Sequence, residues 1–71
     1  MKNTDYLIYN LFEEDVVRFS ESNEIIIYGN INEAKEDAKK LGVGYFIHKV
    51  SDALPNHQLE IKNQINNGKL I

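Results

Sequence analysis

Two histidines are the side chains in this sequence with the widest chemical use. His48 and His57 lie nine residues apart, with carboxylates nearby at Asp52 and Glu60. Neutral imidazole binds metal ions and titrates near neutral pH, so this group defines one hypothesis, a small-ligand or metal-binding domain that uses His48 and His57. The spacing does not place both rings on one helix face, as His-x-x-x-His would. We therefore favour structural roles for the two histidines.

The remaining candidates for chemistry are a glycine pair and two acidic groups. Phosphate-binding glycines connect a strand to a following helix, whereas Gly42-Val43-Gly44 follows an expected helix, so we interpret it as a helix end. Glu13-Glu14-Asp15 and residues 21–24 lack the alternating acids and glycine of a calcium loop, which predicts solvated turns. The serines have no evident histidine and acid partners. The sequence thus predicts a protein that is not an enzyme and needs no cofactor.

Composition restricts the class of protein. The chain has 71 residues, 42% hydrophobic and 27% charged, with no cysteine and a net charge of −3. One domain over residues 1–71 is expected at this length. The negative charge makes direct binding to nucleic acid a poor expectation. No apolar run approaches the ~18 residues of a membrane span, and the first residues lack a secretory pattern, so we expect a cytoplasmic protein without membrane contact.

The elements that must position these residues are clearest in the middle of the chain. Asn30 and Glu33 have capping-box spacing, in which Asn30 accepts from the Glu33 amide and Glu33 reaches back to the Asn30 amide. From there an apolar face recurs at steps of three and four, and it consists of Ile31, Ala34, Ala38 and Leu41. Gly42 follows the last of these residues and predicts the helix end.

Strand signals precede this helix. Residues 6–12 and 16–20 are rich in β-branched and aromatic types and flank three acids, which predicts a hairpin. A competing interpretation makes residues 5–19 one helix, because Ile8, Phe12, Val16 and Phe19 also have helical spacing. Residues 24–28 contain three isoleucines and a tyrosine, and predict a third strand.

A further strand is expected after the helix, over residues 43–50, with Tyr45, Ile47 and Lys49 on one side. Pro55 ends it, because proline has no amide to donate to a sheet. Residues 56–67 predict a second helix, with Gly68 as its end. The alternative is a strand and a hairpin at Asn67-Gly68. The expected fold class is α+β, a small, mainly antiparallel sheet with one amphipathic helix packed on it and one shared core, in the order β-β-β-α-β-α.

The aromatic residues suggest a contact surface. Four tyrosines and three phenylalanines exceed what the core of so small a sheet requires, and tyrosine is favoured at protein interfaces. A short sheet also leaves edge amides unpaired, so a homodimer is expected through the first strand or the last. The candidate binding residues are Tyr6, Ile8 and Phe12, with Tyr9 if the register shifts by one, or Tyr45 and Ile47.

The segment from residue 28 to 50 carries a resemblance. Its Asn30-Ile31-Asn32-Glu33-Ala34, Lys39-Lys40-Leu41-Gly42 and Tyr45-Phe46-Ile47 are similar to short proteins of bacteriophages and prophages, in which strands precede a helix that ends in Leu-Gly. The resemblance covers about a third of the chain and transfers no functional residues. It implies a non-enzymatic binder that blocks or redirects a larger protein, such as a host enzyme or an antiphage-defence complex, in the manner of anti-CRISPR proteins.

Overall fold

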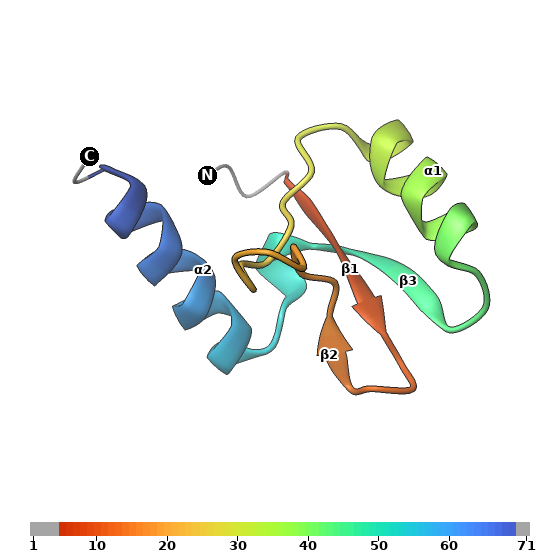
Figure 1. Ribbon diagram of the computed structural model, residues 1–71, viewed down its shortest axis with the longest axis horizontal. Coiled ribbons are helices and arrows are strands. Elements are labelled where there is room, and N and C mark those ends of the chain that lie inside the picture. The colour runs from red at the N-terminus through yellow and green to blue at the C-terminus, as the bar shows by residue number, and fades with distance from the viewer. Residues whose placement is uncertain (1–4, 70–71) are drawn as a thin grey trace.

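The computed structural model describes residues 5–69, and side chains as far as residue 65. Its elements are β1 (Tyr6–Asn10), β2 (Asp15–Val16), α1 (Ile31–Leu41), β3 (Tyr45–Lys49), the 3-10 turn η1 (Val50–Asp52) and α2 (Pro55–Lys69). The three strands form one antiparallel sheet in the order β2-β1-β3. The α+β class is confirmed (Figure 1).

The hairpin is confirmed in place of the single helix over residues 5–19. Tyr9 pairs with Val16 and Asn10 with Asp15, so the turn consists of residues 11–14. Both strands are shorter than expected. Beyond Val16 the chain stays beside β1 for one more residue, where the Val17 amide donates to the Ile8 carbonyl at 2.8 Å.

The expected strand over residues 24–28 is wrong as a continuous strand. Only isolated bridges join Tyr28 to Tyr6 and Ile25 to Arg18. The Ile26 amide donates to Val17, and Tyr28 exchanges two hydrogen bonds with Tyr6. The segment therefore crosses from the hairpin to the beginning of β1, and no single strand lies beside it for long enough to form a ladder.

Helix α1 begins and ends where the sequence predicts. Asn30 is its N-cap, but its side chain accepts from the Asn32 amide at 2.7 Å instead of the Glu33 amide. Gly42 ends the helix with a φ of 103°, and its amide donates to the Ala38 carbonyl. A positive φ of this size favours glycine, because a Cβ would be strained there.

Helix α2 is also confirmed, and the alternative strand and hairpin are wrong. Pro55 is its first residue, a position where its missing amide costs nothing. The Gln58 amide donates to the Leu54 carbonyl at 2.9 Å. The helix extends to Lys69, so Gly68 does not end it.

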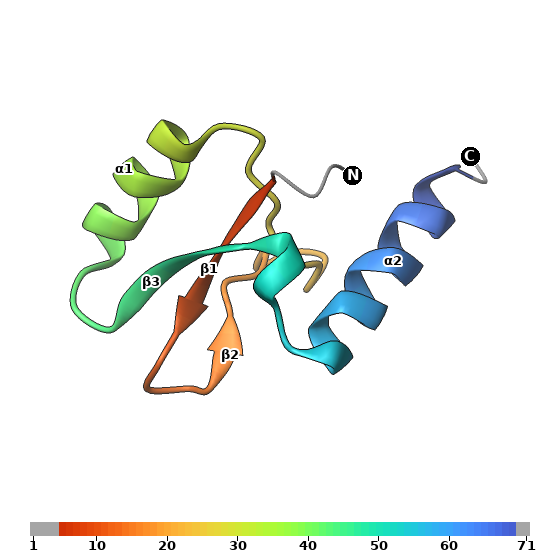
Figure 2. The ribbon, with the colours of Figure 1, turned by 180° about the vertical axis from the view of Figure 1, so that it is seen from behind.

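The two helices lie on opposite sides of the sheet (Figures 1 and 2). This arrangement creates two buried clusters where the sequence suggested one shared core. The α1-side core is built around Ile8, Tyr28 and Ala34. The α2-side core consists of five buried residues, Leu7, Val16, Ile25, Val50 and Ile61. Strand β1 supplies both cores, since successive residues point to opposite faces.

Candidate functional site

Two neighbouring turns form an apolar surface at one end of the molecule. The turn after β1 and the turn before β3 are joined by the Leu11 amide, which donates to the Gly44 carbonyl at 2.8 Å. Leu11, Phe12 and Val43 on these turns have exposed fractions of 55%, 74% and 88%. We call these three residues the end patch. Both turns lie at the end of the molecule away from the last turns of α2 (Figures 1 and 2).

Buried Asn10 holds the first of these turns in place. Its Oδ1 accepts from the Phe12 amide at 3.0 Å and from the Glu13 amide at 3.4 Å. Its Nδ2 donates to the Tyr45 hydroxyl at 3.2 Å, which ties the turn to β3. Asparagine commonly bonds its own backbone in this way. The position of Phe12 is therefore set by the backbone and not by a hydrophobic pocket.

Gly44 completes the end patch by letting the Phe12 ring approach its backbone. A Cβ at this position would lie 2.2 Å from Cε2 of Phe12, and Gly44 has a φ of 93°. The positive φ favours glycine, and a Cβ would also force the exposed Phe12 ring to shift. The Gly42-Val43-Gly44 sequence thus ends α1, as its position after the helix suggested, and the approach of the Phe12 ring to Gly44 is an additional finding.

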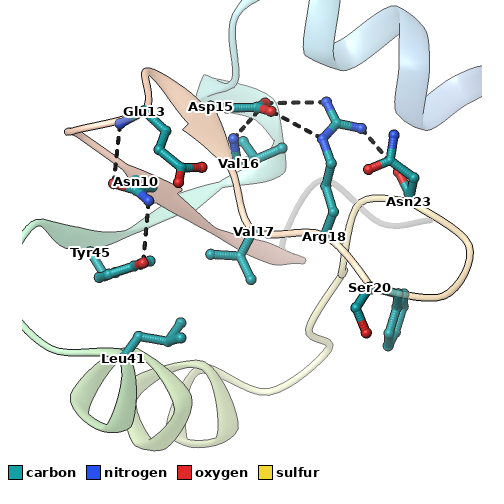
Figure 3. A pocket seen from close by; sticks show the side chains of 11 residues that line it. Asn10, Glu13, Asp15, Val16, Val17, Arg18, Ser20, Asn23, Leu41 and Tyr45 are labelled. Carbon is teal, nitrogen blue, oxygen red and sulfur yellow. Dashed lines mark hydrogen bonds and ion pairs between the residues drawn. The ribbon is translucent and has the colours of Figure 1, made fainter.

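A depression of about 330 Å³ lies beside this end, between the hairpin, the turn over residues 18–23 and the end of α1 (Figure 3). Two pairs of its polar side chains bond each other. Asp15 bonds Arg18, and Asn10 bonds Tyr45. Apolar side chains, among them Val17 and Leu41, also line it.

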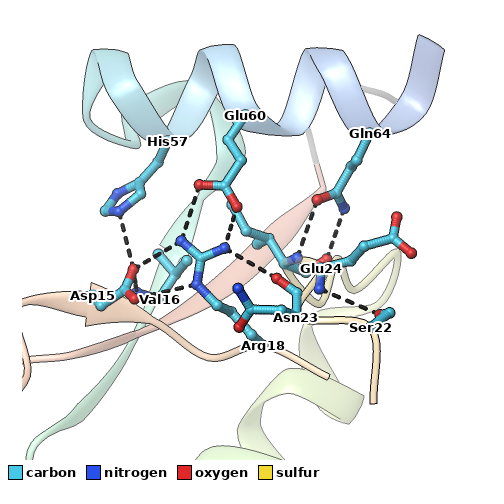
Figure 4. Close-up of polar contacts among 10 residues, drawn as sticks. Asp15, Val16, Arg18, Ser22, Asn23, Glu24, His57, Glu60 and Gln64 are labelled. Carbon is cyan, nitrogen blue, oxygen red and sulfur yellow. Dashed lines mark hydrogen bonds and ion pairs between the residues drawn. The ribbon is translucent and has the colours of Figure 1, made fainter. Parts of the chain in front are cut away.

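A cluster of four charged or titratable side chains connects the hairpin to α2 (Figure 4). Arg18 is its centre, with Nη2 donating to Asp15 at 3.2 Å and to Glu60 at 3.0 Å. Its Nη1 also donates to Glu60 and to the Asn23 carbonyl. His57 is buried, and its Nε2 lies 3.2 Å from Oδ1 of Asp15.

These contacts shift the pKa of each member that Arg18 touches. Hydrogen bonds from Arg18 lower the pKa of Asp15 and of Glu60, because they stabilise the carboxylate forms. The same bonds raise the pKa of Arg18. The positive guanidinium between the two carboxylates makes this cluster a structural tie between the hairpin and α2.

The structure separates the histidines of the metal hypothesis. His57 contacts Asp15 from α2, whereas exposed His48 lies on β3 with its ring 5.7 Å from that of Tyr9. Over residues 5–69, no group of three histidine or carboxylate side chains is arranged to hold a metal ion. Asp15 does not lie in a solvated turn as expected, but begins β2 and pairs with Arg18. Glu13 and Glu14 are exposed as expected.

Most candidate contact residues pack against α1. Ile8 is completely buried, and Tyr6, Tyr45 and Ile47 pack against it on the α1 side of the sheet. Tyr9 packs in the α2-side core. Phe12 is the one candidate whose side chain lies mostly in solvent. The backbone of Tyr45 and Ile47 lies in an edge strand, and β1 is the central one.

Sequence reasoning missed Leu11, Val43 and the Arg18 cluster. Leu11 and Val43 lie in the two turns themselves, and the surface that they share arises because these turns meet in space, which no local pattern reveals. The cluster had a partial signal. Asp15 and Arg18 are three residues apart, as are His57 and Glu60, and Glu60, Ile61, Gln64 and Ile65 share one helix face.

No protein-family model, curated protein or solved structure matches this chain at a significant level. Neither described helix is long and apolar enough to cross a membrane.

Proposed function

We propose that this chain is a non-enzymatic protein-binding module that attaches to a larger protein through its end patch. The supporting observation is the exposure of Leu11, Phe12 and Val43 on two turns whose backbones are bonded to each other. Adjacent exposed apolar side chains are typical of protein contact sites. Because Asn10 and Gly44 hold these turns, binding would require little ordering of the backbone.

The neighbouring charges suit the same role. Glu13 and Glu14 lie beside Phe12 in the chain, and Lys39 and Lys40 are in the last turn of α1, shortly before Val43. A polar border around an apolar centre is the usual arrangement of a protein interface. With its resemblance to small phage proteins, the chain is proposed to act in the host cytoplasm as an inhibitor of a host or antiphage-defence protein.

A capture experiment with matched variants tests this proposal. The wild-type chain, the variant Phe12→Ser/Val43→Ser and the control Phe19→Ser/Leu59→Ser are immobilised and exposed to a bacterial host lysate, and captured proteins are identified by mass spectrometry. The control changes two side chains that are also exposed but lie on the turn over residues 18–23 and on α2. We expect one stoichiometric protein with wild type and control, and its loss with the end-patch variant.

Two results would contradict the proposal. One is the absence of any stoichiometric partner for the folded wild-type chain. The other is recovery of the partner by the end-patch variant in the same amount as by wild type, which would show that the partner binds another surface. Far-UV circular dichroism of each variant verifies that it is folded before the comparison is made.

A further inference from the structure

The outer edge of β3 offers backbone groups that no described residue bonds. The Leu11 amide bonds Gly44, and the Val50 amide bonds Asp5, so the even-numbered residues from 44 to 50 face β1. Hydrogen-bonded and non-bonded positions alternate in an antiparallel pair. The amides of Tyr45, Ile47 and Lys49 consequently point away from the sheet, together with the carbonyls of Tyr45 and Ile47.

At the opposite edge of the sheet, other parts of the chain bond the backbone groups. There the segment over residues 24–28 adds isolated bridges, and the side chain of Gln64 bonds both backbone groups of Ile25. Over residues 5–69, no comparable cover lies on β3, which is the last strand of the sheet on its side (Figure 2). Proteins usually protect such an edge with proline, a bulge or charges, and β3 has Lys49 alone.

We propose that this edge binds a second copy of the chain, as an antiparallel pair of β3 strands related by a two-fold axis at Ile47. Only this register pairs all five residues of β3 with all five of its copy, because Ile47 is the middle residue. The Ile47 amide donates to the Ile47 carbonyl of the other copy, and the Lys49 amide donates to its Tyr45 carbonyl. Symmetry repeats both hydrogen bonds.

The side chains are complementary in the same register. Lys49, the one charged residue of β3, lies opposite Tyr45, whose ring attracts a cation. The two Lys49 ammonium groups stay apart, separated by roughly 14 Å along the strands. On the other face, exposed Phe46 lies opposite exposed His48. An axis at Lys49 would instead place like charges opposite each other, which is destabilising.

An interface of two five-residue edges is small. Specific interfaces below about 1,200 Å² are typically weak, so we expect a dimer that dissociates in the micromolar range. This contact differs from the end patch, and it is tested with variants that leave Leu11, Phe12 and Val43 unchanged.

The decisive variant is Lys49→Pro, with Lys49→Ala as its control. Lys49 has a φ of −70° and a ψ of 145°, so proline fits its backbone. Its amide makes no bond to β1, and the substitution therefore removes a hydrogen bond of the dimer without removing one of the monomer. Alanine removes the same charge but keeps the amide.

Sedimentation equilibrium from micromolar to near-millimolar concentration gives the result. For wild type and Lys49→Ala we expect the mass to rise from 8.2 kDa toward twice that value. For Lys49→Pro we expect a dissociation constant at least about tenfold higher, since two symmetry-related hydrogen bonds are lost. A wild-type mass that stays at one chain, or equal association of the proline variant, would overturn the proposal.

Disulfide formation tests the register. The chain has no cysteine, so Phe46→Cys and His48→Cys each introduce a single thiol. The two positions face each other at a non-bonded pair, where the Cα atoms are close enough for a disulfide. With dissolved oxygen as the oxidant of the two thiols, an equimolar mixture should form the mixed dimer faster than either variant links to itself. Equal rates for all three combinations would overturn this register.

Discussion

Gln64 of α2 makes the two backbone hydrogen bonds to Ile25 that a neighbouring strand would make. Its Nε2 donates to the Ile25 carbonyl at 2.9 Å, and its Oε1 accepts from the Ile25 amide at 3.1 Å. A side-chain amide has the same donor and acceptor as a peptide group, so it ends the sheet here without another strand. Helix α2 thus contacts the backbone of the segment over residues 24–28 as well as the side chain of Ile25.

Replacement of Gln64 tests this connection. Gln64→Glu keeps the size of the side chain but cannot donate to the Ile25 carbonyl when ionised, and Gln64→Ala removes both bonds. We expect Gln64→Ala to lower the free energy of unfolding by about 2 kcal/mol, because two backbone groups lose their partner. Exposed Lys62 on the same helix provides the control, Lys62→Ala. Urea unfolding measures the free energy of unfolding of the three variants. If both Gln64 variants are as stable as Lys62→Ala, Gln64 does not have this role.

Acid should weaken the contact between the hairpin and α2. Arg18 lowers the pKa of Asp15 and of Glu60 below their ordinary values of 3.8 and 4.5. A lowered pKa in the folded state gives stability that is present above the ordinary value and is lost as the pH falls through the folded one. We expect the urea midpoint to fall between about pH 5 and pH 2.

Arg18→Met identifies the source of this pH dependence. Without the guanidinium, both carboxyls return toward their ordinary pKa values, so the variant should be less stable at neutral pH and lose less stability on acidification. The Asp15 and Glu60 side chains are 38% and 40% exposed, so solvent screens their ion pairs with Arg18. The contribution of these ion pairs to the free energy of unfolding is therefore modest. Parallel wild-type and variant curves of midpoint against pH would show that Arg18 is not responsible.

The main elements could be predicted from local signals. Asn30, the apolar steps to Leu41 and Gly42 determine α1 almost without tertiary context, because caps and periodicity act within the helix. The three isoleucines after Glu24 show the limit of this reasoning. β-branched residues indicate an extended chain, but a ladder also requires a neighbouring strand. Here the side chain of Gln64 bonds the Ile25 backbone in place of such a strand, and only isolated bridges form.

The candidate site was harder to predict than the fold. Tyr45 and Ile47 were expected on one side of a strand, and they do share a side, but α1 packs against it. The end patch depends on contact between two turns more than thirty residues apart in sequence, at Leu11 and Gly44. Aromatic content suggested a contact surface, but only the topology shows which aromatic side chains remain exposed.

The bond between Tyr28 and Asp37 holds α1 to the segment before it. The Tyr28 hydroxyl donates to Oδ2 of Asp37 at 2.6 Å, and burial together with this bond raises the pKa of Tyr28. We expect Tyr28→Phe to lower the free energy of unfolding by about 1.5 to 3 kcal/mol, as for a bond to a charged group. Tyr9→Phe is the control, since no described residue bonds the Tyr9 hydroxyl. If Tyr28→Phe and Tyr9→Phe unfold at the same temperature, the bond between Tyr28 and Asp37 does not stabilise the fold.

Three glycine variants separate the two reasons for Gly44. Gly44→Ala introduces a Cβ against Phe12 at a positive φ, Gly42→Ala has the positive φ in open space, and Gly29→Ala has neither. We expect Gly44→Ala to cost roughly 1–3 kcal/mol, Gly42→Ala less, and Gly29→Ala little. Thermal unfolding measures the order. Equal stability of all three variants would show that Phe12 does not approach Gly44 closely.

The affinity of the captured partner for this chain measures directly whether the end patch is the binding surface. Titration calorimetry with the purified partner compares wild type, Phe12→Ser/Val43→Ser and Phe19→Ser/Leu59→Ser. If Phe12 and Val43 are central to the contact, at about 2 kcal/mol for each residue, their double variant should bind about a thousandfold more weakly, and the control should bind like wild type. Unchanged binding by the end-patch variant, or a larger loss with the control, would contradict the account.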